Sequence, residues 1–75
     1  MTIEELKIGK KIEYVDKTTK KGGHDRTHVY NVINFVKVKD HNTNEWYEGV
    51  VYENSNNFYV KSLEVVLNEF KLHNE

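Results

Sequence analysis

Apolar and polar residues alternate through much of this chain, which is the pattern of β-strands that place one face in a core. On this basis strands are predicted over residues 10–15, 45–52 and 58–61. The polar segments 39–44 and 53–57 predict tight turns. The three strands between residues 28 and 61 are therefore expected to form a meander.

Residues 28–38 form the strongest predicted strand, because seven of these positions are β-branched or aromatic. Apolar side chains occupy both of its faces, and the alternation fails around Asn34. A long strand whose inward face changes partway is typical of a small barrel with a bulge or sharp bend. Gly49, in the next strand, marks a bend or a close approach of two backbones.

Helical signals occur at both ends of the chain. Thr2 and Glu5 have the spacing of a capping box, which predicts one helical turn ended by Gly9.

Near the other end, Ser62 is a favourable N-cap. The spacing that follows it predicts a helix over residues 62–72, packed on the sheet as a lid. Lys71 and His73 suit the carboxyl end of that helix. Its apolar stripe consists of Leu63, Val66, Leu67 and Phe70.

These elements predict a mainly β fold: a small barrel of four to five antiparallel strands with a short C-terminal helix. Residues 1–75 are expected to form a single domain, with an N-terminal turn over 1–9. Residues 16–26 contain no hydrophobic side chain, which predicts a flexible basic loop. The core is expected from Ile12, Val29, Val32, Ile33, Val36, Val50, Tyr52, Val60, Leu63, Leu67 and Phe70.

Composition narrows the class of protein. With 75 residues, a net charge of −1 and nine aromatics, the chain fits one small globular domain. It has no cysteine, which excludes disulfides and thiolate metal sites. No apolar run is long enough to span a bilayer or to act as a signal peptide, so a cytoplasmic location is expected. The abundance of Lys, Asn, Ile, Tyr and Phe indicates an A/T-rich bacterial or phage genome.

Charge is divided between the two halves of the chain. Residues 6–39 carry a net charge of +6, and residues 40–75 carry −5. Such a division favours a dipolar surface able to steer a charged partner, unless the strands of the two halves mix the charges in space.

Five short motifs follow one another along residues 9–70. They are Gly9; Tyr30-Asn31-Val32; Val50-Val51-Tyr52; Phe58-Tyr59-Val60-Lys61; and Leu63 with Phe70. Their order resembles a family of short bacterial and phage domains of unknown function with an SH3-like barrel. The resemblance implies that barrel and no activity. The chain departs from the family by having Lys61-Ser62 in place of a basic residue and proline, and by its longer loop at 16–26.

No pattern in the sequence predicts catalysis, so we expect a protein that is not an enzyme and needs no cofactor or metal. In extended chain His24 and His28 would lie about 13 Å apart, too far to share a tetrahedral ion. His41 is in a turn and His73 in the tail. Neither Ser55 nor Ser62 lies in a nucleophile elbow, and the Gly22-Gly23 pair lacks Walker spacing.

Two binding functions remain. The first is a protein-binding module, a phage-type modulator or inhibitor of a host or bacterial protein, whose acidic surface meets a basic partner. Its expected binding residues are Glu45, Trp46, Glu48, Glu53, Tyr59 and Glu64.

The alternative is nucleic-acid binding through Lys17, Lys20, Lys21 and Arg26, with Tyr30, Trp46, Tyr47 and Tyr59 as stacking faces. The net charge of −1 weighs against this alternative, because such binders are usually strongly basic. A homodimer is left open, and no membrane partner is expected.

Overall fold

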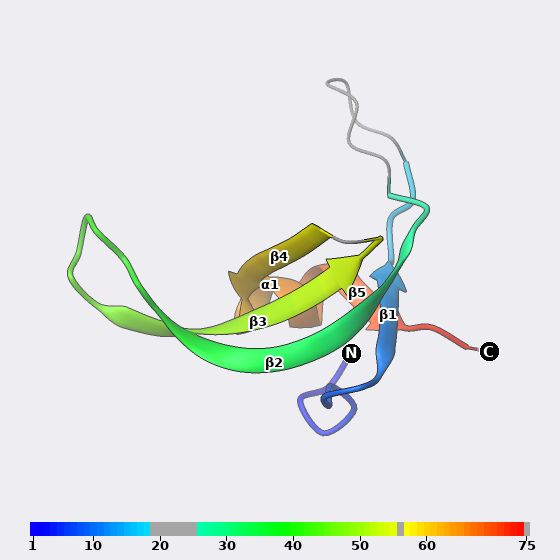
Figure 1. Ribbon diagram of the computed structural model, residues 1–75, viewed down its shortest axis with the longest axis horizontal. Coiled ribbons are helices and arrows are strands. Elements are labelled where there is room, and N and C mark those ends of the chain that lie inside the picture. The colour runs from blue at the N-terminus through cyan, green and yellow to red at the C-terminus, as the bar shows by residue number, and fades with distance from the viewer. Residues whose placement is uncertain (19–25, 56, 75) are drawn as a thin grey trace.

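Five antiparallel strands and one short helix make up the computed structural model, which describes residues 1–18, 26–55 and 57–74 (Figure 1). The strands form one sheet in the order β4-β3-β2-β1-β5. The mainly β prediction is confirmed, but the sheet is not closed, so an SH3-like barrel is not confirmed. The elements are β1 (Lys11–Tyr14), β2 (Val29–Lys39), β3 (Trp46–Asn54), β4 (Asn57–Ser62), α1 (Leu63–Glu69) and β5 (Phe70–Leu72).

The predicted irregularity in β2 is confirmed. The register of β2 against β3 shifts between Val32 and Asn34. Before the shift Val32 lies opposite Tyr52, and after it Phe35 lies opposite Val50. The β2 positions on the same side as Tyr52 and Val50 therefore change from even to odd numbers, because one extra residue reverses the alternation of side chains. Figure 1 shows the strong curvature of the β2–β3 hairpin.

One aromatic ring from each strand enters a shared cluster. The Tyr30 ring meets the other four edge-to-face, with centroid distances between 5.1 and 6.0 Å. Its side chain is almost fully buried, at 3% exposure. The members are Tyr14 (β1), Tyr30 (β2), Tyr52 (β3), Tyr59 (β4) and Phe70 (β5). Each such pair contributes about 0.5–1.5 kcal/mol beyond its buried area, so this aromatic cluster joins all five strands.

Burial also sets the ionisation of one member of the cluster. Removal from water is the largest effect, and together with the neighbouring Tyr14 it raises the pKa of the Tyr52 hydroxyl far above its ordinary value. Tyr52 is therefore uncharged at neutral pH.

The rest of the core agrees in part with the predicted set. Ile12, Val32, Val50, Tyr52 and Phe70 are buried as predicted, and Leu63 and Leu67 pack against them. Val29, Ile33 and Val36 are only half-buried. The prediction for Val60 is wrong: it is 51% exposed, because it lies on the opposite face of the sheet from the core. The core also includes Leu6, Tyr14, Tyr30 and Val66, which were not predicted.

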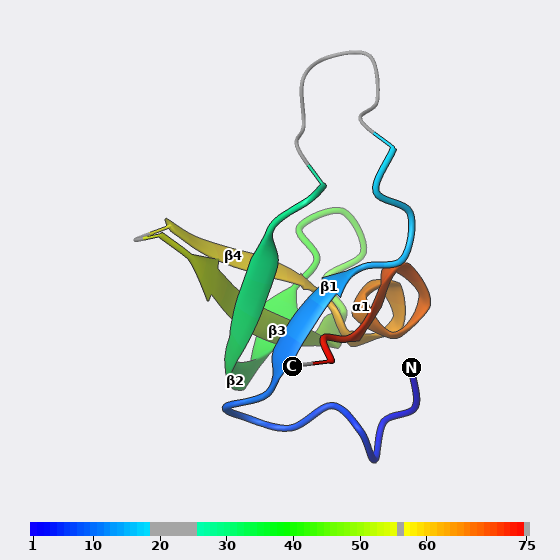
Figure 2. The ribbon, with the colours of Figure 1, turned by 90° about the vertical axis from the view of Figure 1, so that its right-hand side faces the viewer.

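The N-terminal prediction is confirmed in part. The Thr2 backbone N–H donates to Glu5 Oε1 at 2.9 Å, which is one half of the predicted capping box. Residues 2–6 form a turn rather than a helix, and Gly9, with φ at 89°, lies in a second turn closed by the Lys10 N–H and the Lys7 carbonyl at 3.1 Å. The N-terminal ammonium group donates to the Leu67 carbonyl at 3.1 Å. Figure 2 shows this N-terminal segment running below α1, which lies beside β1.

The helix begins as predicted and ends earlier. Ser62 Oγ accepts a hydrogen bond from the Val65 N–H at 3.2 Å, which confirms the N-cap. The prediction of a helix to residue 72 is wrong, because β5 pairs with β1 and places Phe70 opposite Tyr14. Lys71 therefore lies on a strand rather than in the last turn of a helix. Within the described ranges no helix is long and apolar enough to cross a membrane.

We expect Tyr30→Ala to lower the free energy of unfolding by about 3–5 kcal/mol, because it removes the ring that contacts all the others. Tyr47→Ala is the matched control. Its side chain is exposed on the neighbouring strand, and its loss is expected to cost under about 1 kcal/mol. Urea denaturation measures both, and Tyr30→Leu replaces Tyr30→Ala if the latter does not fold. Equal losses at positions 30 and 47 would contradict the central role of Tyr30.

Candidate binding surface

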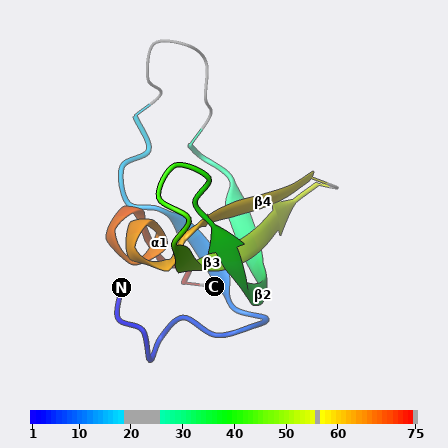
Figure 3. The same cartoon turned by 90° about the vertical axis from the view of Figure 1, so that its left-hand side faces the viewer.

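The sheet has two faces that differ in what covers them. Residues directly opposite each other on neighbouring strands point to the same side. The core face carries Val32, Tyr52, Phe35 and Val50, and we call the other side the open face. Beyond Phe35 and Val50 the hairpin continues as an arm, residues 36–39 and 46–49, which extends past α1 and β4 in Figure 1. Figure 3 looks onto the tip of this arm.

Trp46 and Glu48 continue the core face along the arm. Lys37 lies opposite Glu48, and Lys39 lies opposite Trp46. Trp46 is exposed, with 64% of its surface open to solvent. A large aromatic side chain on an exposed arm is a suitable anchor for a partner.

An apolar hollow lies where the arm meets the N-terminal turn and the start of α1. Its volume is about 450 Å³, and we call it the groove. Ile3, at 56% exposure, is an apolar side chain that the fold leaves on the surface there. The groove is lined by Ile3, Leu6, Phe35, Glu48 and Leu63.

Carboxylates are carried by the same segments that form the groove. Glu48 forms an ion pair with Lys37, with 2.6 Å between Oε1 and Nζ. Hydrogen bonds from Thr2 hold the pKa of Glu5 below its ordinary value, so Glu5 is ionised at neutral pH. The glutamates are Glu4 and Glu5 in the turn, Glu45 and Glu48 in or beside the arm, and Glu64 in the first turn of α1; the lysines of these segments are Lys7, Lys37 and Lys39.

The structure brings together part of the predicted acidic surface. Glu48 lines the groove, Trp46 extends the same face, and Glu64 directly follows the lining residue Leu63. Glu53 and Tyr59 belong elsewhere. Glu53 lies opposite Phe58 on the open face, whereas Tyr59 forms the rim of the aromatic cluster. The groove also shows lining residues that the sequence did not suggest. For Phe35 the signal was the change of face at Asn34, which places its side chain on the core face opposite Val50.

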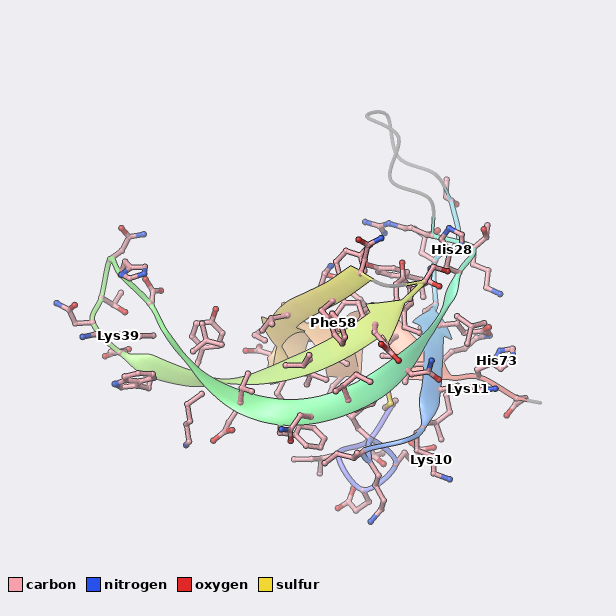
Figure 4. The ribbon with its side chains drawn as sticks, viewed as in Figure 1. Lys10, Lys11, His28, Lys39, Phe58 and His73 are labelled. Atoms are coloured by element: carbon pink, nitrogen blue, oxygen red, sulfur yellow. The ribbon has the colours of Figure 1, made fainter. Side chains whose placement is uncertain are left out.

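The open face is apolar and has Gly49 at its centre. A Cβ atom on Gly49 would lie 2.8 Å from Val38 Cγ2 and 3.2 Å from Val60 Cγ1, so valine side chains, and not the predicted second backbone, approach Gly49 closely. Phe58, labelled in Figure 4, and Tyr47 are also exposed on this side. Nothing in the described part of the chain shows what covers this face.

The basic residues predicted to hold nucleic acid do not form a free cluster in the part of the loop that is described. Lys17 Nζ lies 3.4 Å from Glu13 Oε2, and the Arg26 guanidinium lies 5.0 Å from the centre of the Tyr14 ring. Lys20 and Lys21 lie outside the described residues.

Four rings were predicted as stacking faces. The prediction for Tyr30 is wrong, because its ring is buried in the aromatic cluster. Tyr59 belongs to the same cluster. Trp46 and Tyr47 are exposed, but neighbouring residues of a strand point to opposite faces. The four rings therefore do not form one stacking platform.

The histidines are dispersed. His28 and His41 are exposed, and His24 lies outside the described residues. His73 Nδ1 lies 3.0 Å from Glu13 Oε2. Across residues 1–18, 26–55 and 57–74, no three His, Asp or Glu side chains are close enough to hold a metal ion.

Comparison of this chain with protein-family models, curated proteins and solved structures finds no match. The resemblance to short SH3-like domains therefore stays a prediction.

Glu13 is expected to make stability depend on pH. The hydrogen bond to His73, followed by contacts with Lys17 and Lys71, lowers the Glu13 pKa below its ordinary value of 4.5. Its contribution is therefore fully present above pH 4.5 and is lost as the pH falls through the lowered pKa.

We expect Glu13→Gln to flatten the fall in the urea midpoint below pH 4.5, measured by fluorescence. Glu64→Gln, which changes an exposed carboxylate on α1, is expected to keep the slope of the parent protein. Parallel curves for the parent protein and Glu13→Gln would show that Glu13 does not act in this way.

Proposed function

We propose that this protein is a non-enzymatic protein-binding module whose groove takes the apolar side chains of a basic segment in a partner protein. One observation carries the proposal: an apolar hollow lies on a face of the sheet that continues, two residues before the lining residue Glu48, to the exposed Trp46, among segments rich in glutamate. Apolar contact at an exposed aromatic anchor supplies affinity, and the surrounding charges supply selectivity.

Charge complementarity identifies the occupant. Five glutamates against three lysines in the surrounding segments favour a partner with lysine or arginine beside its apolar residues. The same charges repel the phosphates of nucleic acid. With a volume of about 450 Å³ the groove holds only a few side chains, so a few consecutive residues fit it better than a long helix.

The cellular setting is part of the proposal. The chain is short and rich in residues with A/T-rich codons. Together with a basic partner, this suits a phage-type modulator of a host protein in the bacterial cytoplasm. We also propose a relation to SH3-like domains. It is supported by the antiparallel order of the strands and by the bend in β2 at the register shift.

A six-residue peptide with a central Leu-Phe pair and two lysines on each side tests the groove. We expect it to shift the amide resonances of Ile3, Leu6 and Leu63 in a saturable way. A peptide with glutamates in place of the lysines is expected to bind at least tenfold more weakly. No saturable binding of the basic peptide, or equal binding of both, would overturn the proposal.

Adjacent residues of the arm provide a matched pair of variants. Trp46→Ala removes an anchor on the groove side. It is expected to lower the affinity for the basic peptide by about 30-fold, or 2 kcal/mol. Tyr47→Ala removes a side chain on the open face and is expected to change the affinity by less than about twofold. Equal losses from the two variants would place the binding surface elsewhere.

A further inference from the structure

Strand β4 forms one edge of the sheet, and among the described residues no strand lies on its outer side. Residues 57–60, the first four of this strand, are exposed. Figure 2 and Figure 3 both show the β3–β4 hairpin projecting away from α1. Alternate residues of an edge strand direct their N–H and C=O groups outward, so this edge can pair with a further strand.

β4 lacks the features that commonly protect an edge strand from other chains. It contains no proline, and it pairs with β3 over six residues without a register shift. Its one charged residue, Lys61, lies opposite Val50 on the core face, where Nζ is 3.3 Å from Glu69 Oε1. The other edge strand, β5, has only three residues and includes Lys71. Of the two edges, β4 is therefore the one suited to pairing.

Apolar side chains reach the β4 edge on both faces of the sheet. On the open face, Phe58 and Val60 are 65% and 51% exposed. On the core face, Tyr59 stacks on Tyr52 with 5.4 Å between ring centroids, and it is the one ring of the aromatic cluster that is not buried. A strand added at this edge would cover all three exposed side chains.

A second copy of β4 matches this edge in both side chains and charge. Antiparallel pairing about a two-fold axis at Tyr59 places Phe58 of each copy opposite Val60 of the other. Aromatic and β-branched side chains form favourable cross-strand pairs. The two Tyr59 side chains meet on the core face, which extends the aromatic cluster across the axis. Like charges do not meet, because Lys61 lies opposite Asn57 of the second copy.

We propose that the protein forms a symmetric dimer through β4, which joins the five strands of each copy into one sheet. This pairing occupies the β4 edge of both copies, so assembly stops at two. The edge shares no residue with the groove lining, so the dimer is separate from the proposed binding function. A standard interface uses about 20–30 residues a side, whereas β4 has six, so a dissociation constant of about 10–100 μM is expected.

Sedimentation equilibrium from about 5 to 500 μM, which brackets the expected constant, tests the dimer. Phe58→Lys is expected to weaken dimerisation at least tenfold, because a charge at the edge opposes pairing. The fold is expected to persist, since Phe58 is exposed and lies opposite Glu53. Tyr47→Lys makes the same change on the open face away from β4, and it is expected to weaken dimerisation less than twofold. A monomer at every concentration, assemblies larger than two, or equal weakening by both variants would overturn the proposal.

Cysteine variants test the register, because the natural chain has no cysteine. In an equimolar mixture of Phe58→Cys and Val60→Cys, directly opposite Cβ atoms lie about 4.5–5.5 Å apart, so air oxidation is expected to link the copies. Each variant alone places its cysteines diagonally, about 7–8 Å apart, and is expected to link at least fivefold more slowly. Equal linking in the mixture and in the separate solutions would overturn the proposed pairing.

Discussion

Tyr30 is the residue on which the arrangement of this molecule depends. Its ring contacts an aromatic ring from each of the four other strands, so a single side chain on β2 links the whole sheet. The chain has 37% hydrophobic residues and no cysteine, which leaves little else to stabilise 75 residues. Aromatic rings bury more area per residue than aliphatic side chains, and their edge-to-face contacts fix geometry as well.

The register shift in β2 converts this core into a binding surface. Residues before the shift face the aromatic cluster, whereas Phe35 beyond it meets the N-terminal turn and α1 at the groove. The arm then carries Trp46 past the core, where the ring is exposed. Gly49 allows the valines of the open face to close over the backbone. One inserted residue thus separates the part of the hairpin that stabilises the fold from the part available to a partner.

Much of this organisation was predictable from local patterns. Strands β1 to β4, the Ser62 cap, the irregularity near Asn34 and the crowding at Gly49 follow from propensity, spacing and alternation. The end of the helix was not predictable in this way. Phe70 continues the helical spacing, but pairing with β1 stabilises it as a strand, and that partner lies more than fifty residues away.

Local patterns were also insufficient to predict the candidate site. Alternation cannot tell which face of an apolar strand is covered. The sequence therefore predicts Val60 in the core and Tyr30 on the surface, whereas Val60 is exposed and Tyr30 is buried. The groove joins the N-terminal turn to the arm and α1, and no local pattern reports such a meeting. Glutamate positions were visible in the sequence, yet only pairing of the strands shows that Glu48 lies beside the groove and Glu53 on the other face.

Native-state hydrogen exchange tests most directly whether the aromatic cluster unites the five strands and leaves the arm separate. The account predicts that protected amides of Ile12, Val32, Val50 and Phe70 exchange with one common free energy, equal to that of global unfolding. Protected amides of Val38 and Tyr47 on the arm are predicted to exchange through a smaller opening that leaves the cluster intact. Independent opening of β1 or β4, or exchange of the arm only through global unfolding, would contradict it.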